Sequence, residues 1–123
     1  MMQPMAHILV IDDRADLAVT LQMLLQRAGH HVVTAENGRR GLRAFHENRP
    51  DLVVLDVKMP ELDGWETLER LRDLSDVPVL MFSGTTPAAE ELERLRPGRD
   101  AFRRKPFFGN ELAHVVDELL EAA

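Results

Sequence analysis

The sequence predicts an α/β fold in which a five-stranded parallel sheet is doubly wound by helices, (βα)5. Five short apolar runs alternate with helical patterns along the 123 residues. Three of these runs are almost continuous Val, Ile, Leu and Met, as in parallel strands that are buried on both faces. The connections are short and contain no low-complexity tract or linker. A chain of this length supports one core, so we expect residues 1–123 to form a single domain.

The predicted strands are the apolar runs, at 8–11, 32–35, 52–55, 77–82 and, more weakly, 101–102. Between them, apolar residues recur with the spacing of one helix face. The first stripe is Leu17, Leu21, Leu24, Leu25 and Ala28, and Gly29 follows as the C-terminal stop. A second helix fits 38–48, with Leu42 and Phe45 facing inward. Trp65, Leu68 and Leu71 mark the third helix, Ala89, Leu92 and Leu95 the fourth before Pro97-Gly98, and Asn110 caps the fifth.

Composition excludes several classes of protein. The chain is 45% hydrophobic and 29% charged, without an apolar run of the roughly 18 residues that a membrane helix needs. The first residues lack the basic and apolar regions of a signal peptide. The absence of cysteine excludes disulfides and thiolate metal sites, and suits the cytoplasm, where we expect the protein. The net charge of -6 argues against nucleic-acid binding by this domain itself.

Polar residues stand at the carboxyl ends of four predicted strands, the edge at which such folds bind ligands. These residues are Asp12 and Asp13, Asp56, Ser83 and Lys105. Three converging carboxylates need a cation, and oxygen ligands favour Mg²⁺ or Mn²⁺. A carboxylate beside such a metal can attack a phosphoryl group, which the ammonium and the hydroxyl can contact.

Each of these residues also has an ordinary interpretation. Asp12 and Asp13 could cap a helix, about as readily as bind a metal, and Asp56 could cap a turn. Ser83 could be a loop residue and Lys105 a solvated charge. All five at one edge by chance would be improbable, so the set favours a phosphoryl-accepting metal site.

Four segments resemble the receiver domain of bacterial two-component response regulators, which has a flavodoxin-like fold. They are "ILVIDD" (8–13), "DLVVLDVKMPELDGWE" (51–66), "VPVLMFSG" (77–84) and "RKPF" (104–107). The resemblance covers essentially the whole chain, and the second segment is the most specific.

The resemblance implies a role for each residue of the site. Asp56 would be the phosphoacceptor, and Asp12, Asp13, Asp56 and the backbone carbonyl of Lys58 would hold Mg²⁺, with Asp13 bound directly and Asp12 through water. Ser83 and Lys105 would contact the phosphoryl group, and Phe102 stands at the family's rotamer-switch position. The Lys105–Pro106 bond would be cis, which proline permits at low cost.

Some residues depart from the family pattern. Phe102 has no hydroxyl, and Pro97 and Arg99 replace small residues around Gly98. Arg103 replaces a usually apolar residue of the fifth strand, and marks either an edge position or an interaction surface. Lys58 would face the site, where it would either stabilise the acyl phosphate or obstruct the attacking water.

The expected function is that of a signalling switch with no external turnover substrate. The donor would be a sensor histidine kinase, a phosphotransfer protein or a small phosphodonor. The fourth helix, fifth strand and fifth helix would contact a downstream effector or a second copy.

The expected alternative is a phosphorylation-independent interaction module, which would have lost one of the five residues. A phosphatase would need an acid where Lys58 stands, and a flavodoxin-type nucleotide carrier would need a Gly-rich loop after the first strand. A single-domain regulator and the receiver of a longer protein both remain open.

Overall fold

The computed structural model describes residues 6–106 and 110–123, so Phe107 of the "RKPF" segment lies outside the described residues. All strands lie parallel in a single sheet of order β2-β1-β3-β4-β5. The strands are β1 His7–Ile11, β2 His31–Ala35, β3 Leu52–Asp56, β4 Val79–Ser83 and β5 Ala101–Arg104. This topology confirms the predicted doubly wound α/β fold.

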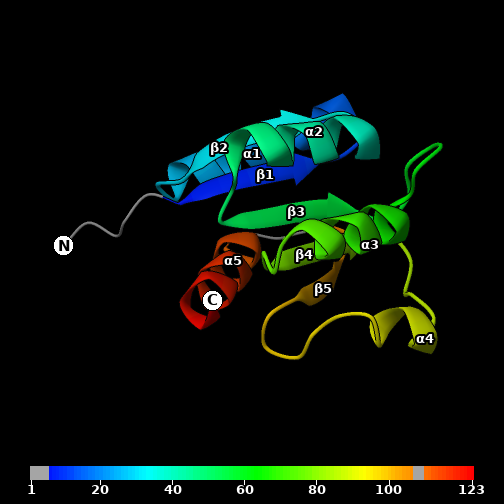
Figure 1. The fold of residues 1–123 in the computed structure, drawn as a ribbon. Helices are drawn as coiled ribbons and strands as arrows, with labels where there is room; N and C mark the ends of the chain where they lie inside the picture. Colours follow the sequence, from blue (N-terminus) through cyan, green and yellow to red (C-terminus); the bar gives the residue numbers. More distant parts are fainter. Residues whose placement is uncertain (1–5, 107–109) are drawn as a thin grey trace.

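Helices cover both faces of the sheet (Figure 1). They are α1 Ala15–Arg27, α2 Gly38–Asn48, α3 Gly64–Leu74, α4 Ala89–Leu92 and α5 Glu111–Ala122. One apolar cluster joins the sheet to α1 and α5, and the other joins it to α2 and α3. Trp65 lies in the second cluster, which confirms that it is an inward residue of α3. None of the described helices is both long enough and apolar enough to cross a membrane.

Local interactions define where most helices begin and end. Asn37 accepts the Arg40 amide at the start of α2, and Asp63 and Glu66 form a reciprocal capping box at the start of α3. Gly29 follows α1 with a φ of 97°, as expected for a glycine stop. Asn110 occupies the N-cap position of α5, but its side chain makes no capping hydrogen bond, so that detail of the prediction was wrong.

The fourth strand begins two residues later than the sequence predicted. Pro78 has no N–H to donate to a strand ladder, and the Val77 amide donates to the Ser75 hydroxyl at 3.1 Å. The regular strand therefore starts at Val79 and runs through Ser83.

The fourth helix is shorter than its apolar spacing predicted. It ends at Leu92, and the Leu95 amide donates to the Leu92 carbonyl, a tighter turn than that of an α-helix. None of the residues of α4 is buried. Because packing supplies most of the stability of a short helix, α4 remains a single turn.

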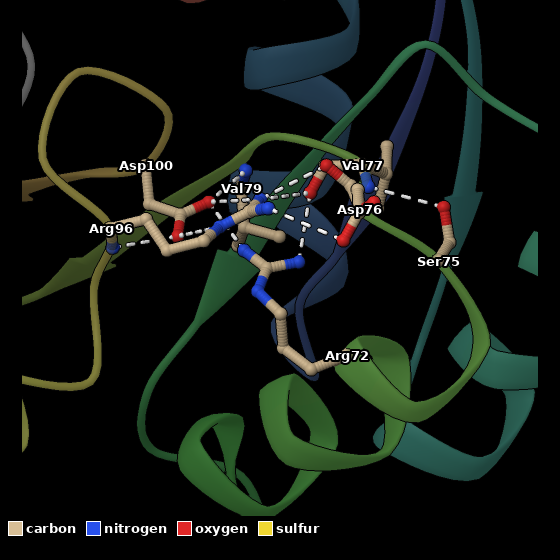
Figure 2. Close-up of polar contacts among 7 residues, drawn as sticks. All are labelled: Arg72, Ser75, Asp76, Val77, Val79, Arg96 and Asp100. Carbon is tan, nitrogen blue, oxygen red and sulfur yellow. Dashed lines mark hydrogen bonds and ion pairs between the residues drawn. The ribbon is translucent and has the colours of Figure 1, made fainter.

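A buried carboxylate connects three segments at the amino-terminal edge of the sheet (Figure 2). Asp100 accepts hydrogen bonds from the Val79 amide at 3.0 Å and from the amide and Nε of Arg96 at 2.9 and 3.0 Å, and it is also paired with Arg72. Burial alone would raise the pKa of Asp100, but the hydrogen bonds from Arg96 and Arg72 together hold it below its ordinary value. The network joins α3, the start of β4 and the segment that leads into β5.

Candidate functional site

Three carboxylates meet at the carboxyl-terminal edge of the sheet. Asp12 and Asp13 follow β1, and Asp56 is the last residue of β3, the strand that lies beside β1. One oxygen from each of the three residues lies within 4.8 Å of the others. Asp12 and Asp56 are buried, with 1% and 2% of their surfaces exposed, whereas Asp13 is exposed. The structure thus brings together the acidic residues that the sequence singled out.

Two buried oxygens in this cluster make no hydrogen bond with the described residues. Asp12 Oδ1 accepts the Arg14 amide at 2.9 Å, whereas Asp12 Oδ2 accepts none, and Asp56 Oδ1 has only an ion pair with the Lys105 ammonium. Burying such oxygens is costly unless something compensates them. The oxygens around one Mg²⁺ lie about 3 to 4 Å apart, so small side-chain movements would let the cluster hold this ion. The donor set therefore fits a hard divalent cation.

Helix capping does not account for the acidic pair. The N-cap residue of α1 is Arg14, and no side-chain hydrogen bond caps this helix. Asp12 instead accepts the amide of the N-cap residue itself. The alternative interpretation of Asp12 and Asp13 as ordinary caps of α1 is therefore not supported.

Burial makes the two inner carboxylates harder to ionise. The pKa of Asp56 is raised to about 6, first by burial and then by the charge of Asp12, while Lys105 acts in the opposite direction. Burial also raises the pKa of Asp12. Near neutral pH, both groups would therefore gain from a nearby cation.

Lys105 places an ammonium group beside Asp56. Its Nζ lies 3.4 Å from Asp56 Oδ1 and 4.9 Å from the centroid of the Phe82 ring. Lys105 directly follows β5, and the bond from Lys105 to Pro106 is cis. The cation thus lies where it can contact both the carboxylate and a group bound to it.

Ser83 lies at the end of β4, and its backbone is hydrogen-bonded to the backbone of Lys105. Its carbonyl accepts the Lys105 amide at 2.8 Å. The buried Ser83 hydroxyl accepts the Thr85 amide at 3.2 Å and lies 3.3 Å from the Thr85 hydroxyl. In this structure the Ser83 side chain is therefore engaged with its own loop.

The remaining predicted residues lie in the β3–α3 loop and on β5. Lys58 lies in the β3–α3 loop, where its exposed side chain helps to line a hollow of about 450 Å³, and its backbone carbonyl remains a predicted ligand. Phe102 is half-buried and packs against the apolar cluster that joins the sheet to α2 and α3. Arg103 lies on β5, at one edge of the sheet, which agrees with the edge interpretation of its charge.

Sequence reasoning did not identify Gly64 and Thr85 as parts of the site. A Cβ atom on Gly64 would lie 2.3 Å from the Asp56 carbonyl oxygen and 2.7 Å from Val57 Cα, so the close approach of the two backbones requires glycine. The Gly64 amide also donates to the Val57 carbonyl at 2.8 Å. The Asp-Gly dipeptide of the second segment was the available signal, but residue spacing does not reveal backbone proximity.

The chain matches the family model described as "Response regulator receiver domain" over residues 8–117. A probable transcriptional regulator, ycf27, of Guillardia theta is 38% identical over 113 residues, which are 92% of this chain and 44% of that protein. The transcriptional regulatory protein PrrA of Mycobacterium tuberculosis is 40% identical over 115 residues, which are 93% and 49% of the two chains. The chain thus spans about half the length of these curated relatives.

Two solved structures resemble this chain in both fold and sequence. The chemotaxis protein CheY4 of Vibrio cholerae has a TM-score of 0.85 and 29% identity, covering 94% of this chain and 99% of its own. NtrX of Brucella abortus has a TM-score of 0.85 and 30% identity, covering 96% of this chain and 28% of its own. The acidic cluster, the neighbouring lysine and the family match lead to one conclusion: the chain belongs to the response regulator receiver domain family.

Proposed function

We propose that Asp56 accepts a phosphoryl group, in a Mg²⁺-dependent transfer from the phosphohistidine of a sensor histidine kinase or phosphotransfer protein. The observation that carries this proposal is the position of Asp56, which is buried within 4.8 Å of the Asp12 and Asp13 oxygens and 3.4 Å from the Lys105 ammonium. A small phosphodonor would serve as an alternative source.

In the proposed step, a carboxylate oxygen of Asp56 forms a bond to phosphorus, and the phosphorus–nitrogen bond of the donor breaks. The donor imidazole leaves with the electron pair and takes up a proton. Asp12 and Asp13, together with the Lys58 carbonyl, would hold the metal. Bound there, Mg²⁺ would offset the negative charges of the carboxylates and the phosphoryl group.

Lys105 and Ser83 would orient the transferred group. Lys105 already lies beside Asp56, so its ammonium can pair with a phosphoryl oxygen while the carboxylate is consumed as an acyl phosphate. Ser83 would exchange its contact with Thr85 for a hydrogen bond to another phosphoryl oxygen. The same residues would support slow hydrolysis of the chain's own acyl phosphate, so we do not expect turnover of an external substrate.

This exchange would alter the surface formed by α4, β5 and α5. Movement of Ser83 would reach β5 directly, because the Ser83 carbonyl accepts the Lys105 amide. Phe102, which is half-buried on the same strand, would turn further inward. A downstream effector or a second copy of the chain would then distinguish the two states. We place this function in the cytoplasm, without direct nucleic-acid binding by this domain.

The test is mass spectrometry after exposure to acetyl phosphate or phosphoramidate. We expect Mg²⁺-dependent addition of about 80 Da to the wild type and none to Asp56→Asn. Asp73→Asn is the matched control, because Asp73 is an exposed carboxylate on α3, and it should be labelled like the wild type.

Labelling of Asp56→Asn, or an unchanged wild-type mass with both donors and with a panel of histidine kinases, would contradict the proposal. The second result would favour the phosphorylation-independent interaction module.

A further inference from the structure

Two histidines form a contact at the edge of the sheet opposite the acidic cluster. His7 and His31 are the first residues of β1 and β2 and are paired in register, so both side chains lie on the same face. Both residues are exposed, and their ring centroids are 5.0 Å apart with 48° between the ring planes. The receiver chemistry uses neither side chain.

The separation of the rings matches that of two imidazoles on one metal ion. An ion bound at about 2.1 Å to one nitrogen of each ring would lie about 3.2 Å from each centroid. The centroids would then lie about 4.5 to 5.2 Å apart for ligand angles between square-planar and tetrahedral. The observed 5.0 Å falls within this interval, so the spacing of the two exposed rings is compatible with one nitrogen of each binding a common ion.

The backbone around the two rings is held by hydrogen bonds. The His7 amide donates to Asp51 Oδ2 at 2.8 Å, and the Asp51 amide donates to the His7 carbonyl at 2.7 Å. The His31 amide donates to the Ala6 carbonyl at 2.8 Å. Ordering the two ligands thus requires loss of side-chain freedom alone, and the Asp51 carboxylate adds negative charge at the same edge.

We propose that His7 and His31 form a two-imidazole site for a divalent transition metal such as Zn²⁺, Ni²⁺ or Cu²⁺. Imidazole nitrogen suits these borderline metals, whereas Mg²⁺ prefers oxygen. The histidine pair and the acidic cluster would therefore select different metals. The two sites lie at opposite ends of β1, about 16 Å apart along the strand. Water would complete the coordination, and the ion would cross-link the starts of β1 and β2.

Isothermal titration calorimetry with Zn²⁺ tests the proposal on the full chain after removal of bound metals. Excess Mg²⁺ in the buffer would fill the proposed oxygen site at the acidic cluster without competing for imidazole. We expect one equivalent of Zn²⁺ to bind, and binding to weaken about tenfold or more in His7→Gln and in His31→Gln. Because both side chains are exposed, these variants should fold, and their unfolding curves without metal should match that of the wild type.

His114→Gln is the matched control. His114 is an exposed histidine on α5 whose Nε2 lies 3.5 Å from Glu118, so this pair offers two alternative Zn²⁺ ligands at ordinary helical spacing. Under the proposal, His114→Gln retains full affinity, and Zn²⁺ shifts the ring resonances of His7 and His31 in nuclear magnetic resonance spectra. Absence of Zn²⁺ binding to the wild type, or loss of binding in His114→Gln with His7→Gln and His31→Gln unaffected, would overturn it.

Discussion

The Asp56 carboxylate has a pKa raised to about 6, because burial and the charge of Asp12 oppose its ionisation. An aspartate whose pKa is raised on folding binds its proton more tightly in the folded chain than in the unfolded one. Its stabilising contribution is therefore fully present below about pH 4 and is lost as the pH rises to about 6. Asp12, whose pKa is also raised, acts in the same direction.

We therefore expect Asp56→Asn to stabilise the metal-free protein above pH 6, because the amide carries no charge. Its free energy of unfolding should exceed that of the wild type by on the order of 1 to 2 kcal/mol at neutral pH, and the difference should shrink below about pH 4. Urea denaturation in EDTA across this pH range measures it. A difference that stays constant with pH would contradict the stated role of the Asp56 charge.

Gly64 lies against the backbone of Asp56, so we expect Gly64→Ala to destabilise the fold. The new Cβ would lie 2.3 Å from the Asp56 carbonyl oxygen. The backbone of residue 64 fixes the position of this Cβ, and the carbonyl oxygen belongs to the backbone of β3, so neither atom can move away freely. A loss of about 1 to 3 kcal/mol is typical of such overpacking.

Gly84→Ala is the matched control for the stability measurement, because its Cβ would have no atom of the described residues within 4 Å. Chemical denaturation of both variants gives the comparison. Equal stability of Gly64→Ala and Gly84→Ala would mean that the close approach does not restrict residue 64.

At the scale of elements, the Asp100 network connects α3 to the start of β4 and to the segment before β5. We expect Asp100→Asn to lower the free energy of unfolding by about 2 to 4 kcal/mol, because it leaves the Arg72 and Arg96 cations half-buried without their carboxylate. Asp76→Asn is the control. The Asp76 side chain is 89% exposed and its pair with Arg96 spans 3.6 Å, so its removal should cost less than about 1 kcal/mol.

Because the pKa of Asp100 is lowered on folding, its contribution has the opposite pH dependence to that of Asp56. The stabilising contribution of Asp100 is fully present above the ordinary aspartate pKa of about 4. It is lost as the pH falls through the lowered pKa of the folded chain. The destabilisation caused by Asp100→Asn should therefore diminish in acid. Urea denaturation measures both effects. Equal losses in the free energy of unfolding for Asp76→Asn and Asp100→Asn would contradict the claim that the buried carboxylate contributes more than the exposed one.

The elements also show what the sequence could predict. Strands β1 and β3 and helix α2 followed from apolar patterns and from turn residues, which act over a few positions. The Asp100 network did not, because Arg72 and Asp100 lie 28 residues apart and no local pattern pairs them. The short α4 also could not be predicted, because the spacing of Ala89, Leu92 and Leu95 does not say whether the sheet offers them a surface to pack against.

At the scale of the whole molecule, Mg²⁺ should stabilise the folded chain, because only folding assembles the acidic cluster. At a Mg²⁺ concentration about 100 times its Kd, mass action would add about 2.7 kcal/mol to the free energy of unfolding. Thermal unfolding with and without Mg²⁺ should show this as a higher Tm for the wild type and little change for Asp13→Asn.

Asp16→Asn is the control for general charge effects, because the Asp16 side chain is 76% exposed and lies only three residues farther along the chain. It should respond to Mg²⁺ like the wild type. An equal Mg²⁺ effect on Asp13→Asn would place the metal elsewhere.

The sequence predicted most of the candidate site, because parallel strands bring their carboxyl ends to one edge and the site residues follow those ends. Asp12, Asp13 and Asp56 could be placed in this way from strand boundaries alone. The contacts of each side chain could not be predicted, because they depend on packing. Examples are the hydrogen bond between Ser83 and Thr85 and the ion pair that Lys105 makes with a buried oxygen of Asp56.

Among the residues that the structure describes, strand β5 pairs with β4 alone and so forms an edge of the sheet. Such an edge is a template for strand addition, which can continue into fibrils. Its sequence, Ala-Phe-Arg-Arg, contains two adjacent guanidinium groups and no acid. Pairing of two such edges would bring like charges together without compensation, so at high concentration the chain should resist sheet extension at β5. A second copy that binds near β5 would then contact it through side chains and leave the strand edge unpaired.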